Sequence, residues 1–94
     1  MSGSGSGTTV IGGEIPALEQ LHHNFQRQAN AVDDLMAALN RDVDSTWWKG
    51  GAADRFRTAW ETEYQPALRR LSQALVDAGD EVRHRAQLLV QVGS

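Results

Sequence analysis

Two Glu-x-x-His pairs are the residues of this chain that come closest to a chemical site. Glu19 precedes His22 by three positions, and Glu81 precedes His84 by the same spacing. Pairs of this kind on facing helices hold two metal ions in some helical bundles. Here both pairs flank the apolar stripes of their helices, and in a hairpin they would be offset by about 12 Å along the axis. We therefore predict solvated surface histidines, with no metal and no cofactor.

Hydroxyl side chains near the middle of the chain are the second candidate chemistry. Ser45 and Thr46 follow Asp44, but no histidine lies near them in the sequence, so they are better explained as turn and capping residues. The glycines that alternate with serine in the first seven residues follow no strand and form no phosphate-binding loop. No residue is predicted to be catalytic, and the chain is predicted not to be an enzyme.

The composition excludes several other classes of protein. The 94 residues allow one small domain with a small core, so association with another chain is expected. Nine basic residues against 12 acidic ones give a net charge of -3 without a basic stripe, which argues against nucleic acid as a partner. Cysteine is absent, and no apolar run approaches the roughly 18 residues that span a membrane. The first residues lack the pattern of a signal peptide, so export would need another route.

The elements that must position these residues are two amphipathic helices. Residues 1–13 are rich in Gly, Ser and Thr and are predicted to be a flexible tail. Apolar residues at intervals of three or four predict a helix over 15–43, with Pro16 in its first turn, and another over 52–91. Turn-forming residues occupy 44–51, and 92–94 are predicted to be a disordered end. The first stripe is Leu18, Leu21, Phe25, Ala29, Val32, Leu35, Met36, Leu39 and Val43; the second is Ala53, Phe56, Trp60, Tyr64, Ala67, Leu68, Leu71, Leu75, Ala78, Val82, Ala86 and Leu89.

Two irregularities are predicted in the second helix. Pro66 leaves the Thr62 carbonyl without its helical donor, but the apolar spacing continues from Tyr64 to Leu68, so we predict a kink near residue 66 and not an end. Because the first helix is predicted to be shorter, the second should run alone beyond about Gly79 and fray towards its end.

The turn between the helices reads Trp47-Trp48-Lys49-Gly50-Gly51-Ala52. Glycine permits the backbone to reverse, and a tryptophan can clamp two helices at the bend. Two adjacent tryptophans cannot face the same side, so one of them is predicted to be partly exposed or to lie in the dimer contact. With Ala52 and Phe56 after it, and placed midway between two amphipathic helices, Trp48-x-Gly50 resembles the WXG (Trp-x-Gly) family of small helical hairpins. These are substrates of type VII (ESX) secretion systems, and the resemblance covers about residues 18–89.

The resemblance implies a function as well as a fold. Members of that family are exported as folded homodimers or heterodimers, and the turn of one hairpin lies beside the C-terminal end of its partner. Trp47, Trp48 and Gly50 would then contribute to a feature that the export machinery, including the secretion ATPase, recognises. Export-competent members often carry Tyr-x-x-x-Asp or Tyr-x-x-x-Glu after the second helix, whereas Tyr64 lies inside it and is followed by Leu68. The chain therefore lacks its own signal, relies on a partner that carries one, or is truncated.

We predict an all-α antiparallel helix-turn-helix hairpin that dimerises into an elongated four-helix bundle, with Trp48, Gly50 and Ala52 as its turn motif. Some apolar side chains are too large for one neighbouring helix to cover. Arg57 and Arg85 lie near the stripe, where pairing with a partner carboxylate is one option; the other, for the cluster with Arg85, is a solvated, salt-bridged face. The predicted dimer interface comprises Phe25, Val32, Leu39, Phe56, Trp60, Leu71 and Leu75.

Several alternatives about partner and function stay open at this point. The partner hairpin is either identical or different, and the sequence does not choose between them. The chain is expected to be secreted without a cleavable signal peptide. One alternative function is a membrane-active secreted effector whose helices open on a bilayer. The other is an intracellular helical scaffold or chaperone that is unrelated to secretion.

Overall fold

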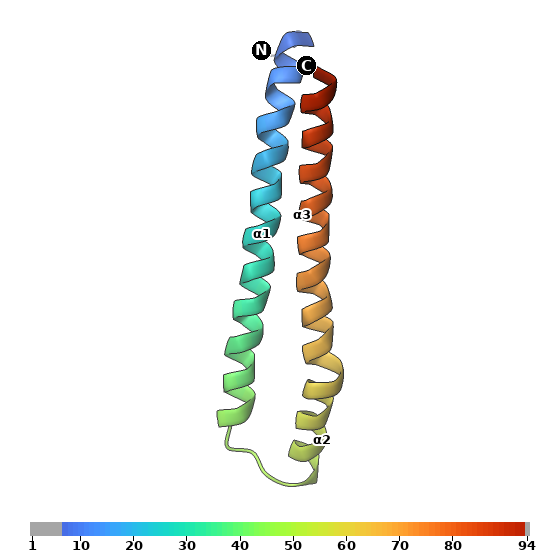
Figure 1. Cartoon of the computed structure of the whole chain (residues 1–94). Helices are drawn as coiled ribbons and strands as arrows, with labels where there is room; N and C mark the ends of the chain where they lie inside the picture. The colour runs from blue at the N-terminus through green and yellow to red at the C-terminus, as the bar shows by residue number, and fades with distance from the viewer. Residues whose placement is uncertain (1–6, 94) are drawn as a thin grey trace.

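The computed structural model of the chain is a two-helix hairpin (Figure 1). It describes residues 7–93, with the side chains of residues 13–92. Helix α1 spans Gly7–Ser45, and the returning rod consists of α2 (Gly51–Ala59), a π-helical turn (Trp60–Tyr64) and α3 (Gln65–Gly93). The molecule is elongated, with extents of 66 × 26 × 14 Å, and residues 7–93 contain no strand. The predicted all-α antiparallel hairpin is confirmed.

Both helices extend further than the sequence predicted. Helix α1 includes residues 7–13, which the composition assigned to a flexible tail, and Pro16 lies inside it instead of in the first turn. Helix formation is cooperative, so a helix that has nucleated extends through residues of modest propensity. Residues 1–6 of the predicted tail lie outside the described residues. At the other end α3 includes residues 92 and 93, which were predicted to be disordered.

The longer α1 also supports the end of the second helix. The start of α1 and the end of α3 lie at the same end of the hairpin, opposite the turn (Figure 1). Ala86 is buried, and Val90 still lines a hollow together with α1 residues. The prediction that the second helix runs alone beyond Gly79 is therefore wrong, because it assumed a first helix that starts near residue 15.

The contact between the two rods is made by small residues. Among the side chains that the structure describes, the buried hydrophobic ones are Ala29, Ala53 and Ala86. Ser72 is also buried, and its Oγ donates a hydrogen bond of 3.4 Å to the carbonyl of Ala29 on the facing helix. Side chains this small let two helices approach closely, which leaves little room for large ones between them. Among the described residues, no large side chain is fully buried.

The irregularity predicted at Pro66 takes the form of the π-helical turn just before it. The N–H of Gln65 donates to the carbonyl of Trp60, five residues earlier. Proline has no N–H, and its ring crowds the carbonyl four residues before it. A π turn is one way in which a helix accommodates such a break in its hydrogen bonding.

The wide turn changes which side chains share a face. The rings of Phe56 and Tyr64 stack, with centroids 6.4 Å apart, although the two residues are eight positions apart. In a regular α-helix they would be rotated by about 80° from each other. The π turn accommodates the additional residue, so the aromatic side chains before and after it stay on one side of the rod.

Candidate functional site

The turn joins the two rods through residues 46–50, and its reversal occurs at Gly50. This residue has φ 108° and ψ -178°, a combination that is almost restricted to glycine. Its carbonyl accepts the N–H of Asp54 at 3.0 Å, which is the first hydrogen bond of α2. On the other side, Thr46 ends α1 by donating its N–H and its Oγ1–H to the carbonyl of Asp42, at 3.0 and 2.5 Å. The glycine of the Trp-x-Gly element is therefore required by the backbone geometry.

Arg57 holds the turn against α2. Its guanidinium donates to the carbonyl of Trp48 at 2.9 Å and to the carbonyl of Thr46 at 3.1 Å. Within this hairpin the guanidinium of Arg57 is therefore engaged by turn carbonyls, and its pairing with a partner carboxylate stays a prediction. Arg85 is likewise engaged, since it forms an ion pair of 2.8 Å with Glu81 one helical turn earlier.

The two adjacent tryptophans differ in their surroundings. Trp47 is 84% exposed, and the Nζ of Lys49 lies 4.8 Å from its ring centroid. Trp48 is 44% exposed, and its ring lies 5.8 Å from that of Phe56. Trp48 also lines a hollow of about 240 Å³ together with Val43 of α1. Trp48 thus contacts the ends of both rods, while Trp47 extends from the tip of the hairpin.

The alanines after the turn are placed differently from each other. Ala53 is completely buried at the start of α2. Ala52, the alanine of the predicted turn motif, is exposed. Of these two alanines, only Ala53 is therefore shielded from solvent.

The large apolar side chains lie on the flanks of the helix contact. Leu21, Phe25 and Leu75 line one shallow hollow of about 220 Å³, so α1 and α3 both contribute to the same apolar face. Leu71 is one helical turn before Leu75, and Tyr64 is two turns before Leu71, so these residues follow the same face. No helix among the described residues is long and apolar enough to cross a membrane.

The residues predicted for a dimer interface fall into two groups. Phe56 and Leu71 are 40% and 47% exposed. Trp60 is partly buried, and its indole N–H is satisfied within the chain by Asn40. The half-buried residues of the predicted interface are Phe25, Val32, Leu39, Trp60 and Leu75.

The arrangement of two amphipathic rods around a Trp-x-Gly turn agrees with a family comparison. Residues 13–93 match the model of the family described as WXG100, proteins of 100 residues with WXG. The chain belongs to the WXG100 family. WXG100 proteins are small helical proteins that type VII systems secrete without a signal peptide; they typically pair with other WXG proteins and are not known as enzymes. Comparisons with curated proteins and with solved structures give no match.

In this WXG100 hairpin, His22 is not the solvated surface histidine that the sequence predicted. The residue is 4% exposed, and its Nδ1 lies 2.7 Å from the carbonyl oxygen of Gly79 on α3. A carbonyl only accepts hydrogen bonds, so Nδ1 carries the hydrogen. Gly79 allows the two helices to lie close together here: a Cβ at this position would lie only 3.0 Å from the Cβ of Phe25, although its distance of 3.6 Å from the His22 ring would be an ordinary contact.

The remaining chemical candidates of the WXG100 chain do not form a centre. His84 is exposed, and its predicted companion Glu81 is paired with Arg85. Among the described residues, no three His, Asp or Glu side chains are placed to hold a metal ion. The Oγ1–H of Thr46 caps the end of α1 by donating to the carbonyl of Asp42. The features of this chain with functional potential are therefore its turn, its apolar face and the surroundings of His22.

Proposed function

We propose that this WXG100 protein is one subunit of a pair of hairpins, which a type VII secretion system exports as a folded four-helix bundle. The observation that carries the proposal is a contrast within the hairpin. The described residues that are buried in the hairpin are alanines, Ser72, Gly79 and His22, whereas the large apolar side chains remain partly or half exposed beside them.

The exposed apolar area is substantial for a chain of this size. Leu35 and Tyr64 are each about half exposed, at 50% and 51%, and Leu21 is 41% exposed. Removing apolar surface from water stabilises by about 25 cal/mol per Å². Contiguous apolar patches on soluble monomers are usually small, and larger ones mark interaction sites. A second hairpin laid along this face would cover these residues together with Phe56 and Leu71.

The shape of the face suits helices as partners. The hollow between Leu21, Phe25 and Leu75 is open and apolar, and it is bordered by both rods. Side chains of one helix insert into such spaces between residues of another in bundles and coiled coils. The proposed interface therefore includes the residues predicted from the stripes: Phe25, Val32, Leu39, Phe56, Trp60, Leu71 and Leu75.

The tip of the hairpin is proposed to serve export. Trp47 is almost fully exposed, and Trp48 and Gly50 shape the turn from which it extends. Exposed tryptophans are frequent in protein interfaces because they offer a large apolar area and one donor. We propose that Trp47, Trp48 and Gly50 contribute to recognition by the secretion ATPase, together with the neighbouring end of the partner.

Pairing is tested by charge substitutions at two equally exposed leucines. Leu71 is 47% exposed and lies on the apolar face, whereas Leu88 is 44% exposed and lies about 140° around the helix from Leu75. Leu71→Asp should weaken association at least about tenfold, because it places an unpaired charge in an apolar contact. Leu88→Asp should leave it unchanged. Light scattering measures the mass of the wild type and both variants, alone and with the neighbouring hairpin from the same genome. A folded wild-type monomer in both mixtures at micromolar concentration would refute the proposal.

Export is tested separately by measuring the protein released into the medium. Release should stop in a strain that lacks the secretion ATPase, and Trp47→Ala should lower release while light scattering still shows the pair. Release that continues at the same level without the ATPase would contradict the export part of the proposal and leave the pairing part standing.

A further inference from the structure

Two opposite charges stand on the apolar face of the hairpin, one towards each end. Asp42 lies close to the turn, seven positions after Leu35, and Arg85 lies in the second half of α3, fourteen positions after Leu71. Multiples of seven residues return a packed helix to the same side, so both charges stand in line with these half-exposed leucines. Asp42 also lines the hollow that Trp48 borders at the turn.

The two charges are equally far from the middle of the hairpin. There the rods meet at Ala29 and Ser72, where the Ser72 hydroxyl donates to the carbonyl of Ala29. Asp42 comes thirteen positions after Ala29, towards the turn, and Arg85 comes thirteen positions after Ser72, away from it. At helical rise each charge lies about 20 Å from the middle, in opposite directions. An identical face laid on this one in the reverse direction therefore meets negative charge with positive charge at both ends.

The face between these charges suits a second copy of itself. The positions that continue the two leucine lines inwards are uncharged: Leu21, Gln28 and Leu35 on α1, and Leu71 and Ala78 on α3. Gln28 borders the apolar hollow of the face and precedes Ala29 by one position. A glutamine amide both donates and accepts hydrogen bonds, so two copies of Gln28 are compatible near a two-fold axis, whereas two identical charges would repel.

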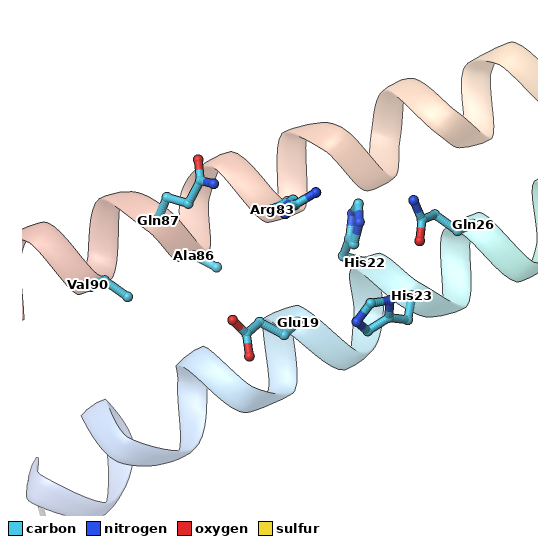
Figure 2. A pocket seen from close by; sticks show the side chains of 8 residues that line it. All are labelled: Glu19, His22, His23, Gln26, Arg83, Ala86, Gln87 and Val90. Carbon is cyan, nitrogen blue, oxygen red and sulfur yellow. The ribbon is translucent and has the colours of Figure 1, made fainter.

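The opposite side of the helix contact does not offer a second surface of this kind. Figure 2 shows the hollow of about 260 Å³ on that side, which is bordered by Glu19, His23 and Gln26 of α1 and by Arg83 and Gln87 of α3. Covering polar and charged groups costs free energy unless each of them finds a partner. The described part of the hairpin therefore offers one apolar face, which favours a closed pair over a larger assembly.

We propose that the second hairpin of the pair is another copy of this chain, laid antiparallel on the apolar face with a two-fold axis at the level of Ala29 and Ser72. Asp42 of each copy then forms an ion pair with Arg85 of the other, so the same contact is made twice. This inference rests on the pairing of hairpins proposed above and names the partner. Within its own chain Arg85 pairs with Glu81, but the two side chains are 68% and 64% exposed, so this ion pair is weak and leaves Arg85 able to change partner.

The crossing of helices in a bundle brings the paired charges within reach. Asp42 is on α1 and Arg85 is on α3, and packed helices lie roughly 8–10 Å apart, so a stack without tilt would separate the charges sideways. Helices in four-helix bundles cross at about 20° with a left-handed twist. About 20 Å from the middle, this tilt moves the turn end of one copy about 7 Å across the other. The movement brings Asp42 towards α3 of the other copy and away from its Glu14, the acidic residue in line with Leu21.

Charge reversal at the two positions tests this arrangement, with light scattering at micromolar concentration as the measurement. The wild-type chain alone should form a pair. Asp42→Arg and Arg85→Asp each place like charges together at both ends, so each should weaken self-association about tenfold. Mixing the two variants restores opposite charges at both ends, as does combining both substitutions in one chain, and both samples should associate as the wild type does. Asp34→Arg and Arg70→Asp change exposed charges outside the face and should have no effect.

The outcomes separate this inference from the proposed function. A wild-type chain that is monomeric alone, but pairs with the neighbouring hairpin from the same genome, overturns the identical partner and leaves the proposed pairing standing. Self-association that neither reversal weakens, or that the mixture does not restore, overturns the antiparallel two-fold arrangement. A chain that pairs with neither partner overturns both proposals. Recovery in the mixture also shows that each variant is folded, because a misfolded chain would not complement the other.

Discussion

The indole N–H of Trp60 donates a hydrogen bond of 2.7 Å to Oδ1 of Asn40, and this bond joins α1 to the π turn. The side-chain amide of Gln65 donates to the same oxygen, also at 2.7 Å. Trp60 and Gln65 are five positions apart, which is about 140° of rotation in a regular α-helix. The i to i+5 hydrogen bonding of the π turn brings them onto one face, where a single acceptor serves both. Asn40 can therefore accept both hydrogen bonds only while residues 60–64 of the facing rod are in the π-helical conformation.

Removing this acceptor should destabilise the hairpin. Asn40→Ala leaves two partly buried donors without a partner, and we expect a loss of about 1–3 kcal/mol in the free energy of unfolding. Asn30→Ala is the matched control, because Asn30 lies exposed on the same helix and the change in helix propensity is the same. Urea unfolding at equal protein concentration measures both variants. Equal stability of the two would show that the shared acceptor contributes nothing.

The adjacent glycines of the turn should respond in opposite ways to alanine. Gly50→Ala forces an L-residue into φ 108° and ψ -178°, which we expect to cost about 1–3 kcal/mol. Gly51→Ala places its Cβ 3.2 Å from the end of the flexible Arg55 side chain, inside the first turn of α2. This change should be neutral or slightly stabilising, because the arginine can move and alanine favours the helix. Thermal unfolding of the two variants tests the pair, and a stable Gly50→Ala would contradict the strained turn.

Gly79 should not tolerate the substitution that normally stabilises a helix. Gly→Ala inside a helix gains about 1 kcal/mol from propensity. At Gly79, however, the new Cβ would lie 3.0 Å from the Cβ of Phe25, an atom fixed to the facing backbone. Separating the rods costs about 1–3 kcal/mol, so we expect no net gain and a weakened His22 hydrogen bond. Gly13→Ala is the control, since nothing lies within 4 Å of its Cβ. A gain at Gly79 equal to that at Gly13 would disprove the close approach.

Arg57 should control the mobility of the turn more than the stability of the rods. Arg57→Lys cannot reproduce both donor contacts to the carbonyls of Trp48 and Thr46, because an ammonium lacks the planar fork. We expect faster hydrogen exchange at residues 46–50 and a loss of about 0.5–1.5 kcal/mol. Arg55→Lys, with no such contact in α2, serves as the comparison. Unchanged exchange in Arg57→Lys would argue against the role of this contact in holding the turn.

The helices and the site of reversal follow from simple patterns in the sequence. Apolar residues at intervals of three and four predict both rods because each rod has one face turned towards the other. The glycines after Trp48 predict the reversal because a positive φ is needed somewhere in so short a turn. What composition could not predict is the start of α1, since the poor helix formers before Pro16 become helical by extension of an existing helix.

The polar residues of the helix contact were missed for a different reason. Periodicity assigns the inner face to apolar residues, so His22 was placed outside although its ring lies between the rods. A signal was present in Gly79, because glycine within a helix destabilises it unless packing requires it. The π turn also left a trace: Phe56, Trp60, Tyr64 and Leu68 recur at intervals of four, whereas a regular helix has about 3.6 residues per turn.

The π turn has a consequence for tracing how hairpins of this kind diverged. Residues 60–64 hold one residue more than an unbroken α-helix would need to carry Phe56 and Tyr64 along one side. Consider a related hairpin that lacks one of these five residues and has no proline after them. Its second rod would be an unbroken α-helix that still presents the same side chains outward, and one single-codon deletion accounts for the difference in length. An alignment of this chain with such a hairpin should have a gap of one position within residues 60–64. Without the gap, every residue from Pro66 onward is aligned one position away from its structural equivalent.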